Sequence, residues 1–199
     1  MICIQYFFKI TKMKKSYLNL AVCLCLCLGA ITSSFAQKEE VCYNPNLVKD
    51  TSKKSIKSVA LGKINTTNFT INYHSPGVRK RVIWGGLVPY DEVWVTGAHD
   101  ATTITFDKDI TINNKTIPPG KYALFTIPGK KEWTVIINKN WEQHLTNEYD
   151  ASEDVVRLKV KPLNNKHLER LQYFIEPDGN IAVAWEKVKI KVPLTVKKS

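Results

Sequence analysis

The sequence is short of the residues and motifs on which common catalytic and redox sites depend. Its 199 residues include four histidines and five cysteines, and no second histidine or cysteine lies within four residues of any histidine. There is no G-x-S-x-G element, no P-loop and no glycine-rich dinucleotide fingerprint. The sequence therefore gives no support to three common classes of protein: serine hydrolases with this motif, P-loop nucleotide hydrolases and dinucleotide-binding domains. We therefore predict no cofactor, no metal and no catalytic residue of these types.

The chain also lacks an apolar run that would span a bilayer, which needs about 20 residues. Its main apolar stretch, residues 18–31, follows Met13-Lys14-Lys15 and precedes Ser34 and Ala36. A basic start, a short apolar segment and small residues before a cut are typical of a secretory signal peptide. We predict cleavage between Ala36 and Gln37, with Met13 as an alternative start. The product is expected to be an exported, periplasmic bacterial protein without a transmembrane segment.

Cysteine is scarce after this segment. Only Cys42 lies beyond residue 36, so the mature chain cannot form an internal disulfide. Cys42 is then a reactive thiol, a link between chains, or a tolerated residue of an N-terminal arm. The other hypothesis for the apolar stretch is lipidation, which requires a small residue before the cysteine. Larger residues stand there, namely Val22, Leu24 and Leu26 before Cys23, Cys25 and Cys27.

Arginine is scarce as well. Removal of the signal would lower the net charge from +11 to +7, and only four of the remaining 25 basic residues are arginine. Lysine is the usual solvated charge, whereas paired recognition of phosphate favours the arginine fork. We interpret the basicity as an aid to solubility, with weak attraction to anionic envelope polymers. Because the protein is expected to be exported, we predict no nucleic-acid partner.

Short β-strands separated by turns dominate what the sequence does contain. Residues 122–127 and 133–138 are apolar at nearly every position and flank a Pro-Gly turn, which indicates central strands covered on both faces. A second hairpin turns at Pro177-Asp178-Gly179 and a third at Asn113-Asn114. This spacing predicts a single antiparallel β-sandwich of roughly eight to ten strands. We expect it to cover residues 58–199, after a polar arm at 37–57.

Two segments alternate between lysine or arginine and apolar residues, at 155–161 and 187–192. They are either a basic patch or exposed strands whose lysines prevent edge-to-edge aggregation, and we favour the second interpretation. Residues 140–154 are predicted to form a loop with one helical turn. A further helical turn is expected at 164–168.

The stretch 87–104, LVPYDEVWVTGAHDATTI, is the main candidate for a site. It holds Tyr90, Trp94, His99 and three carboxylates between segments that read as β-strand. Adjacent acids such as Asp91-Glu92 are more typical of solvated loops than of catalytic pairs. A metal site formed by His74, His99 and Asp100 would require the fold to bring these residues together.

The five tryptophans separate into two groups. Trp133 and Trp185 alternate with apolar positions, which indicates the core. The other three, Trp84, Trp94 and Trp141, either close the ends of the sandwich or present aromatic faces to a sugar or another flat ligand. Trp94 is expected to lie in a strand facing the core, and His99 is expected to be exposed at a sheet end.

The motifs of residues 64–162 resemble an exported bacterial family, domain of unknown function 2911. The resembling motifs are Ser75-Pro76, Leu87-Val88-Pro89-Tyr90, Val93-Trp94, Thr96-Gly97-Ala98, Pro119-Gly120 and Leu124-Phe125-Thr126-Ile127-Pro128-Gly129. The resemblance implies a mostly β fold and export, and it implies no established activity. Val95 stands where the family usually carries arginine, and His99 where it usually carries asparagine. A charge-assisted donor to an anion would therefore be missing at Val95.

Three functional hypotheses follow. The first is a non-catalytic binding or interaction module for a glycan or an envelope protein, with a site formed by Tyr90, Trp94, His99, Asp100 and Arg81. The second is a hydrolase-like enzyme with His99 as the general base, oriented by Asp100 or Asp91. The third is a purely structural envelope protein.

Overall fold

The computed structural model describes residues 52–196, and they form an antiparallel all-β sandwich, as predicted. One layer is a six-stranded sheet in the order β1-β2-β3-β6-β7-β8. Its strands are β1 (Ser55–Ile64), β2 (Thr67–Pro76), β3 (Thr103–Phe106), β6 (Gly120–Ile127), β7 (Trp133–Asn138) and β8 (Asp154–Val160). The predicted signal peptide, its cleavage site and Cys42 lie outside the described residues, as does most of the polar arm. The first strand begins at Ser55, three residues before the predicted start at Ser58.

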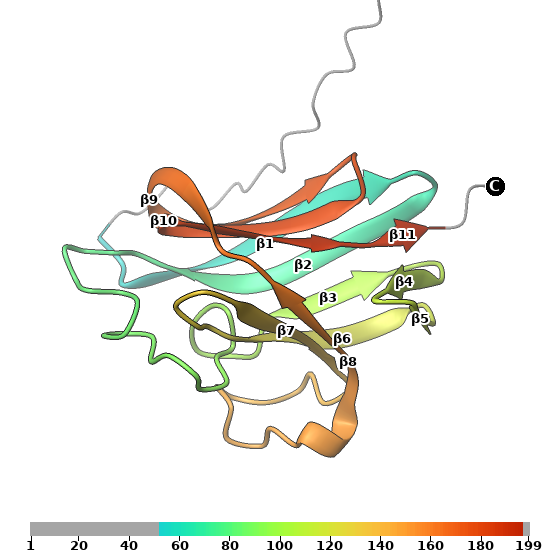
Figure 1. Ribbon diagram of the computed structural model, residues 1–199, viewed down its shortest axis with the longest axis horizontal. Helices are drawn as coiled ribbons and strands as arrows, with labels where there is room; N and C mark the ends of the chain where they lie inside the picture. The colour runs from blue at the N-terminus through green and yellow to red at the C-terminus, as the bar shows by residue number, and fades with distance from the viewer. Residues whose placement is uncertain (1–51, 197–199) are drawn as a thin grey trace, which may run out of the picture. The chain divides into compact units, whose positions relative to one another are not determined.

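The other layer is a long hairpin, which packs against β1 and β2 (Figure 1). Its strands are β9 (Leu163–Glu176) and β10 (Asn180–Pro193). A small third sheet, in the order β11-β4-β5, closes one end of the sandwich. It contains β4 (Ile110–Ile112), β5 (Lys115–Ile117) and β11 (Thr195–Val196). The count is thus eleven strands, and the three strands of the small sheet are only two or three residues long.

The main core lies between the two layers. It gathers the buried apolar side chains of β1, β2, β3 and β6 to β10, among them Leu171, Tyr173 and Ile175 on one strand and Ile181, Val183 and Trp185 on the next. These two triplets share faces because side chains alternate along a strand, as the sequence indicated. The turn of this hairpin places Gly179 at φ 92°, a conformation that glycine adopts at little cost.

The central strands β6 and β7 are covered on both faces, which confirms the prediction from their continuous apolar sequences. Leu124, Val135 and Ile137 belong to the main core. Their neighbours Ala123, Phe125 and Ile136 belong to a second cluster, together with Val95 and Ala101. This outer cluster is covered by irregular chain, because Trp141 and Tyr149 pack against it from the loop after β7.

Of the two predicted helical turns, the one within residues 140–154 is confirmed and the one at 164–168 is wrong. The 3₁₀ turn η1 (Ala151–Glu153) lies within the predicted loop. The segment 164–168 is part of β9, where Leu168 pairs with Glu186 and Asn164 with Val188. Its polar composition favours a loop locally, but pairing with β10 supplies the backbone hydrogen bonds and overrides that preference.

The lysine-bearing strands differ from each other. β8 is the last strand of the six-stranded sheet, and its Arg157 and Lys159 are exposed, as expected for an edge strand. On β10, Lys189 and Lys191 are half-buried and each contacts a carboxylate oxygen of Glu176 at 2.6 Å. These two ion pairs link β9 and β10 near the turn of the hairpin.

Candidate functional site

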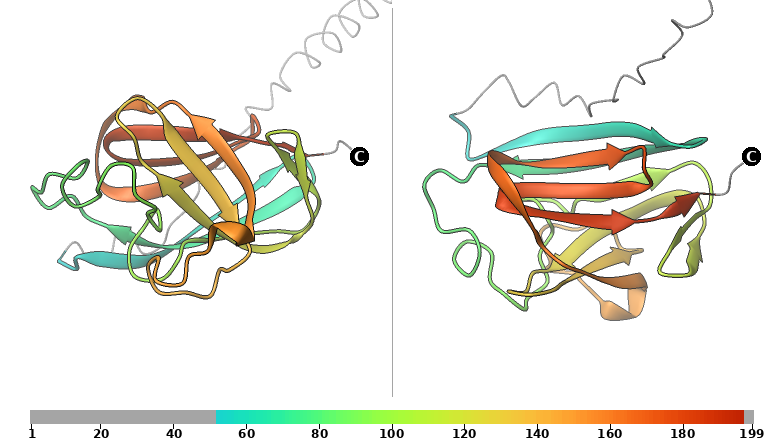
Figure 2. Two further views of the ribbon diagram at one scale, coloured as in Figure 1. Left: turned by 60° about the horizontal axis from the view of Figure 1, so that its bottom comes forward. Right: turned by 45° about the horizontal axis from the view of Figure 1, so that its top comes forward.

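Two long irregular segments shape the concave surfaces of the described chain. Residues 77–102 run between β2 and β3 at one end of the strands, and residues 139–153 run between β7 and β8 (Figure 2). The two segments are bonded to each other, because the Ala101 amide donates to Gln143 O at 3.0 Å and the Leu145 amide donates to His99 O at 2.7 Å. Irregular loops of this length in a compact domain are commonly functional.

The turn at Thr96-Gly97 is fixed by the core. Thr96 is fully buried at φ 52°, an uncommon conformation for a β-branched residue. Its carbonyl accepts hydrogen bonds from Tyr173 Oη at 2.9 Å and from Thr102 Oγ1 at 3.2 Å. A Cβ on Gly97 would lie only 2.8 Å from Thr102 Oγ1 and 3.1 Å from His74 O. Close packing therefore requires glycine at position 97. This part of the Thr96-Gly97-Ala98 motif serves the fold rather than a binding site.

Four tryptophans form one aromatic cluster beside this turn. Trp84 lies 4.9 Å from Trp133 and 5.9 Å from both Trp94 and Trp185, measured between ring centroids. Trp94 stacks on Trp185 at 6.0 Å with an interplanar angle of 21°. Trp133 and Trp185 are buried, as predicted, whereas Trp84 and Trp94 are half-buried.

Trp94 does not lie in a regular strand. It forms a single antiparallel bridge with Thr126, and its indole Nε1 donates to Gly97 O at 3.1 Å. Because its ring lies at the end of the sandwich, it packs against both hydrophobic clusters at once. Strand alternation alone was thus an insufficient guide to the surroundings of this side chain.

A cavity of about 360 Å³ opens next to the stacked rings. Its walls include Arg81, Leu87, Trp94, His99, Leu145 and Trp185, and we call it the tryptophan pocket. Leu87 and Leu145 are 45% and 42% exposed, so the pocket has apolar groups at its rim as well as inside. Exposed apolar groups around a cavity are a common mark of a binding site.

The polar groups that line the tryptophan pocket include one guanidinium, that of Arg81. Arg81 is held in place because its Nη2 donates to Gly77 O at 2.6 Å and its Nε to Val78 O at 3.2 Å. Ser55 and Trp185 also line the pocket, and neither Ser55 Oγ nor Trp185 Nε1 has a hydrogen-bond partner among the described residues. An unpaired buried polar atom costs free energy, so both atoms would gain from a bonding partner.

A second, larger concavity of about 540 Å³ lies beyond His99. It is lined by Asp100, Lys121, Trp141, Gln143, His144 and Glu148, among others, and we call it the loop groove. Lys121 Nζ lies 3.4 Å from the centroid of the Trp141 ring, a cation–π contact. His144 Nδ1 and Asp100 Oδ1 are 3.5 Å apart, and both side chains are largely exposed.

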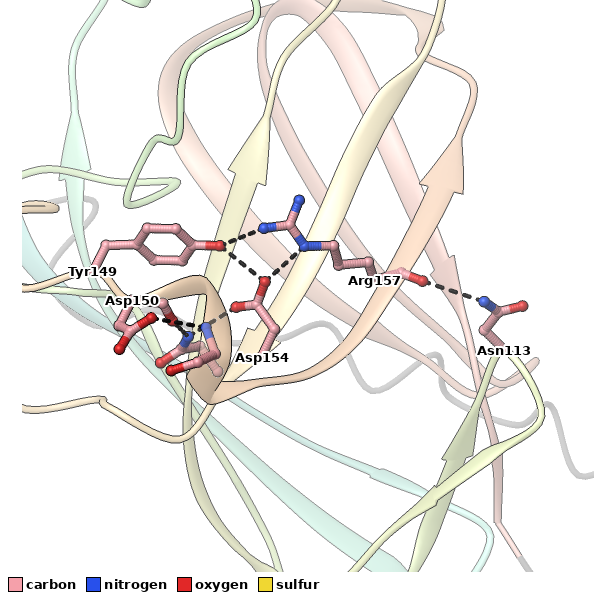
Figure 3. A network of polar contacts seen from close by, with 7 residues as sticks. Asn113, Tyr149, Asp150, Asp154 and Arg157 are labelled. Atoms are coloured by element: carbon pink, nitrogen blue, oxygen red, sulfur yellow. Dashed lines mark hydrogen bonds and ion pairs between the residues drawn. The ribbon is translucent and has the colours of Figure 1, made fainter.

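A hydrogen-bond network anchors the loop that forms one wall of this groove (Figure 3). Tyr149 Oη donates to Asp154 Oδ2 at 2.9 Å, and Arg157 donates to both of these residues from β8. Burial and the bond to Asp154 raise the pKa of Tyr149 to about 12, so its hydroxyl stays protonated at neutral pH. Asp150 caps η1 by accepting from the Ser152 amide, a hydrogen bond that lowers the pKa of this carboxyl.

The residues predicted for the site are divided between these surfaces. Arg81, Trp94 and His99 all line the tryptophan pocket, whereas Asp100 lines the loop groove. Tyr90 lies apart from both, with its ring against Gly85 and 5.8 Å from Lys130 Nζ.

The two carboxylates that were expected to orient His99 in a hydrolase, Asp100 and Asp91, have other contacts. Asp100 contacts His144 rather than His99, and Asp91 adopts φ 63° in a turn where its amide donates to Pro128 O.

Within residues 52–196, no three histidine, cysteine or carboxylate side chains are placed to hold a metal ion. None of the helical segments described is long and apolar enough to cross a membrane.

Several residues of these concavities were not predicted as parts of a binding surface. Ser55 comes from β1 and Trp185 from β10, far away in the sequence. His74, considered above only as a metal ligand, lies on β2 beside His99. His144 lies in a segment with no regular pattern. The one available signal was the length of that segment, because long irregular loops are often functional.

Fold and site together define an antiparallel β-sandwich with ligand-sized concavities beside its long loops. The chain belongs to the family described as "Protein of unknown function (DUF2911)", whose model matches residues 55–194. Searches of curated proteins and of solved structures found no match.

Proposed function

We propose that this protein is an exported, periplasmic binding module without catalytic activity, and that the tryptophan pocket holds a small amphipathic anion. The single observation that supports this most is the position of Arg81, a fixed cation beside the stacked rings of Trp94 and Trp185. An apolar cavity with one or a few placed polar groups is typical of small-molecule sites.

The anionic group of the ligand would lie at Arg81. Two of the donor nitrogens of this guanidinium bond to backbone carbonyls, which fixes its plane, and Nη1 has no such bond to the described residues. A carboxylate would gain a charge-assisted hydrogen bond from Nη1. Lys54 also lines the pocket and adds positive charge near the same place.

The apolar part of the ligand would contact Trp94, Trp185 and the two exposed leucines. Aromatic rings and aliphatic chains both gain free energy from this contact, at about 25 cal/mol per Å² of apolar surface removed from water. A glycan fits this pocket less well, because the hydroxyl groups of a sugar would lose water against Leu87 and Leu145. The hydrolase hypothesis is less favoured, because Asp100 contacts His144 and no carboxylate among residues 52–196 is bonded to His99 to orient its ring.

The N-terminal sequence supports export, with its basic start, short apolar stretch and small residues before Gln37. Intact-mass measurement of the protein recovered from the periplasm tests this proposal. A mass that begins at Gln37 without acyl groups is expected. A product that retains residues 1–36 in the cytoplasm would contradict it.

Intrinsic tryptophan fluorescence is a direct assay for the pocket, because two rings of the cluster line it. We expect decanoate and indole-3-acetate to change the emission with saturation, and decanol and tryptamine to bind more weakly. Arg81→Gln should reduce carboxylate affinity about tenfold, the effect of one charged hydrogen bond, and leave decanol unchanged. Arg79→Gln is the matched control, because Arg79 lies in the same loop but does not line the pocket.

Two results would contradict the proposal. One is the absence of any saturable binding by either carboxylate. The other is an equal loss of affinity in Arg81→Gln and Arg79→Gln, which would indicate a general effect of net charge rather than a placed donor.

A further inference from the structure

The loop groove has a chemistry that the amphipathic-anion site does not use. It brings together three carboxylates from two segments, namely Asp100, Glu142 and Glu148, with the amides of Asn72 and Gln143. Its lysines, Lys57 and Lys121, do not outnumber these acids. The groove is therefore rich in hydrogen-bond acceptors and donors, with no excess of positive charge for an anion.

One of these groups lacks a partner. Gln143 is 7% exposed, and its Nε2 donates to Asn140 O at 2.7 Å. Its Oε1 has no hydrogen-bond partner among the described residues, although the residue lines the groove. This oxygen is buried, so a ligand donor reaches it only if the side chain turns toward the groove, and such a bond would remove the cost of the unpaired oxygen.

An aromatic face lies in the same groove. One part of the Trp141 ring packs against the outer hydrophobic cluster, and the Lys121 ammonium lies over the ring. Lysine side chains are flexible, and a cation–π contact open to solvent is weak. A ligand that stacks on Trp141 can therefore displace Lys121 at small cost.

The loop that presents these groups is fixed before any ligand binds. Asn140 Nδ2 donates to Glu148 O at 3.1 Å, and the Leu145 amide donates to His99 O. The network of Tyr149, Asp154 and Arg157 holds its far end to β8 (Figure 3). Preorganisation lowers the entropy cost of binding, so weak polar contacts can add up to measurable affinity.

We propose that the loop groove is a second binding site, and that its ligand is a neutral or amino-substituted saccharide. A sugar ring offers apolar C–H groups on one face, which pack on the Trp141 ring after Lys121 moves aside. Its hydroxyl groups donate to the carboxylates of Asp100 and Glu148. A uronic-acid saccharide is disfavoured, because its carboxylate would face those of the groove. The site is separate from the tryptophan pocket and does not depend on it.

Isothermal titration calorimetry of the mature protein tests the proposal with three tetrasaccharides. We expect binding of the N-acetylglucosamine tetramer and of the glucosamine tetramer, and none of the galacturonate tetramer. Lys121→Ala should strengthen binding several-fold, because it frees the ring. Asp100→Asn together with Glu148→Gln should weaken it by about tenfold or more, as expected for lost charged hydrogen bonds.

Lys159→Ala is the control for Lys121→Ala, because Lys159 is an exposed lysine of β8 that pairs with Glu132 away from the groove. Trp141→Phe keeps a packed ring and should still lower the affinity. Arg81→Gln should leave saccharide binding unchanged, which separates this site from the first. The proposal is overturned if neither glucosamine-based tetramer binds to the wild type or to Lys121→Ala. It is equally overturned if Lys121→Ala and Lys159→Ala have the same effect.

Discussion

The imidazole rings of His74 and His99 meet edge to face, with 5.1 Å between their centroids. His74 lines the loop groove and His99 lines the tryptophan pocket, and both line a third, open concavity of about 680 Å³ that includes Ser55 and Lys57. The histidine pair therefore separates the two concavities.

The first prediction concerns pH. The pKa of His74 is lowered by burial and by the nearby His99 and Lys57, against the opposing effect of Asp100. Because the unfolded chain takes up this proton before the folded chain does, the free energy of unfolding should be highest above pH 6.5 and fall as the pH drops below it. Urea unfolding at pH 7.5 and pH 5.0 measures the difference.

His74→Gln should reduce this pH dependence, and His99→Gln should reduce it in part by removing one cause of the shift. If His74→Gln had the same pH dependence as the wild type, His74 would not be its source.

The second prediction follows from the backbone of His99. This exposed residue has φ 62°, in the left-handed region that asparagine tolerates better than most residues. His99→Asn should keep the free energy of unfolding within about 0.5 kcal/mol of the wild type, as for surface substitutions. His99→Val should lower it by about 1–2 kcal/mol, because a β-branched residue is strained there. Urea unfolding of the two variants gives the comparison, and equal stability would contradict this account.

The third prediction tests the close packing at Gly97. Gly97→Ala should destabilise the fold by about 1–3 kcal/mol, since a Cβ would meet Thr102 Oγ1 and the backbone of His74. Thermal unfolding would show the loss. Gly120→Ala is the control, because a Cβ there would lie 3.3 Å from the edge of the Tyr122 ring, which can shift. A Gly97→Ala protein as stable as the control would show that the turn can relax.

The fourth prediction addresses Trp94. Trp94→Ala should cost about 3 kcal/mol, at the low end for a truncated aromatic side chain because this ring is half-buried. Val82→Ala, at a residue that is 75% exposed, should change the free energy of unfolding by less than about 0.5 kcal/mol. Chemical denaturation followed by circular dichroism avoids the change in fluorescence. A loss below 1 kcal/mol in Trp94→Ala would mean that the ring supports binding rather than folding.

The predictable parts of the fold depend on local patterns. The hairpin of β6 and β7 was evident because both faces of each strand are apolar, and that of β9 and β10 because its core residues alternate around a glycine turn. The same reasoning failed at 164–168, where polar residues join a strand only because β10 lies beside them. Local propensity is a weak guide wherever a partner strand supplies the hydrogen bonds.

The sequence by itself determined the fold class, the main turns and the burial of Trp133 and Trp185, because alternation along a strand decides which face a side chain occupies. It also identified residues 87–104 as unusual. Only the tertiary structure decided that Arg81 lies with Trp185, that Asp100 contacts His144 and that His74 meets His99. These contacts join residues far apart in the chain or on different sides of a turn. Strand order and the course of two irregular loops create them, and no local pattern in the sequence encodes either.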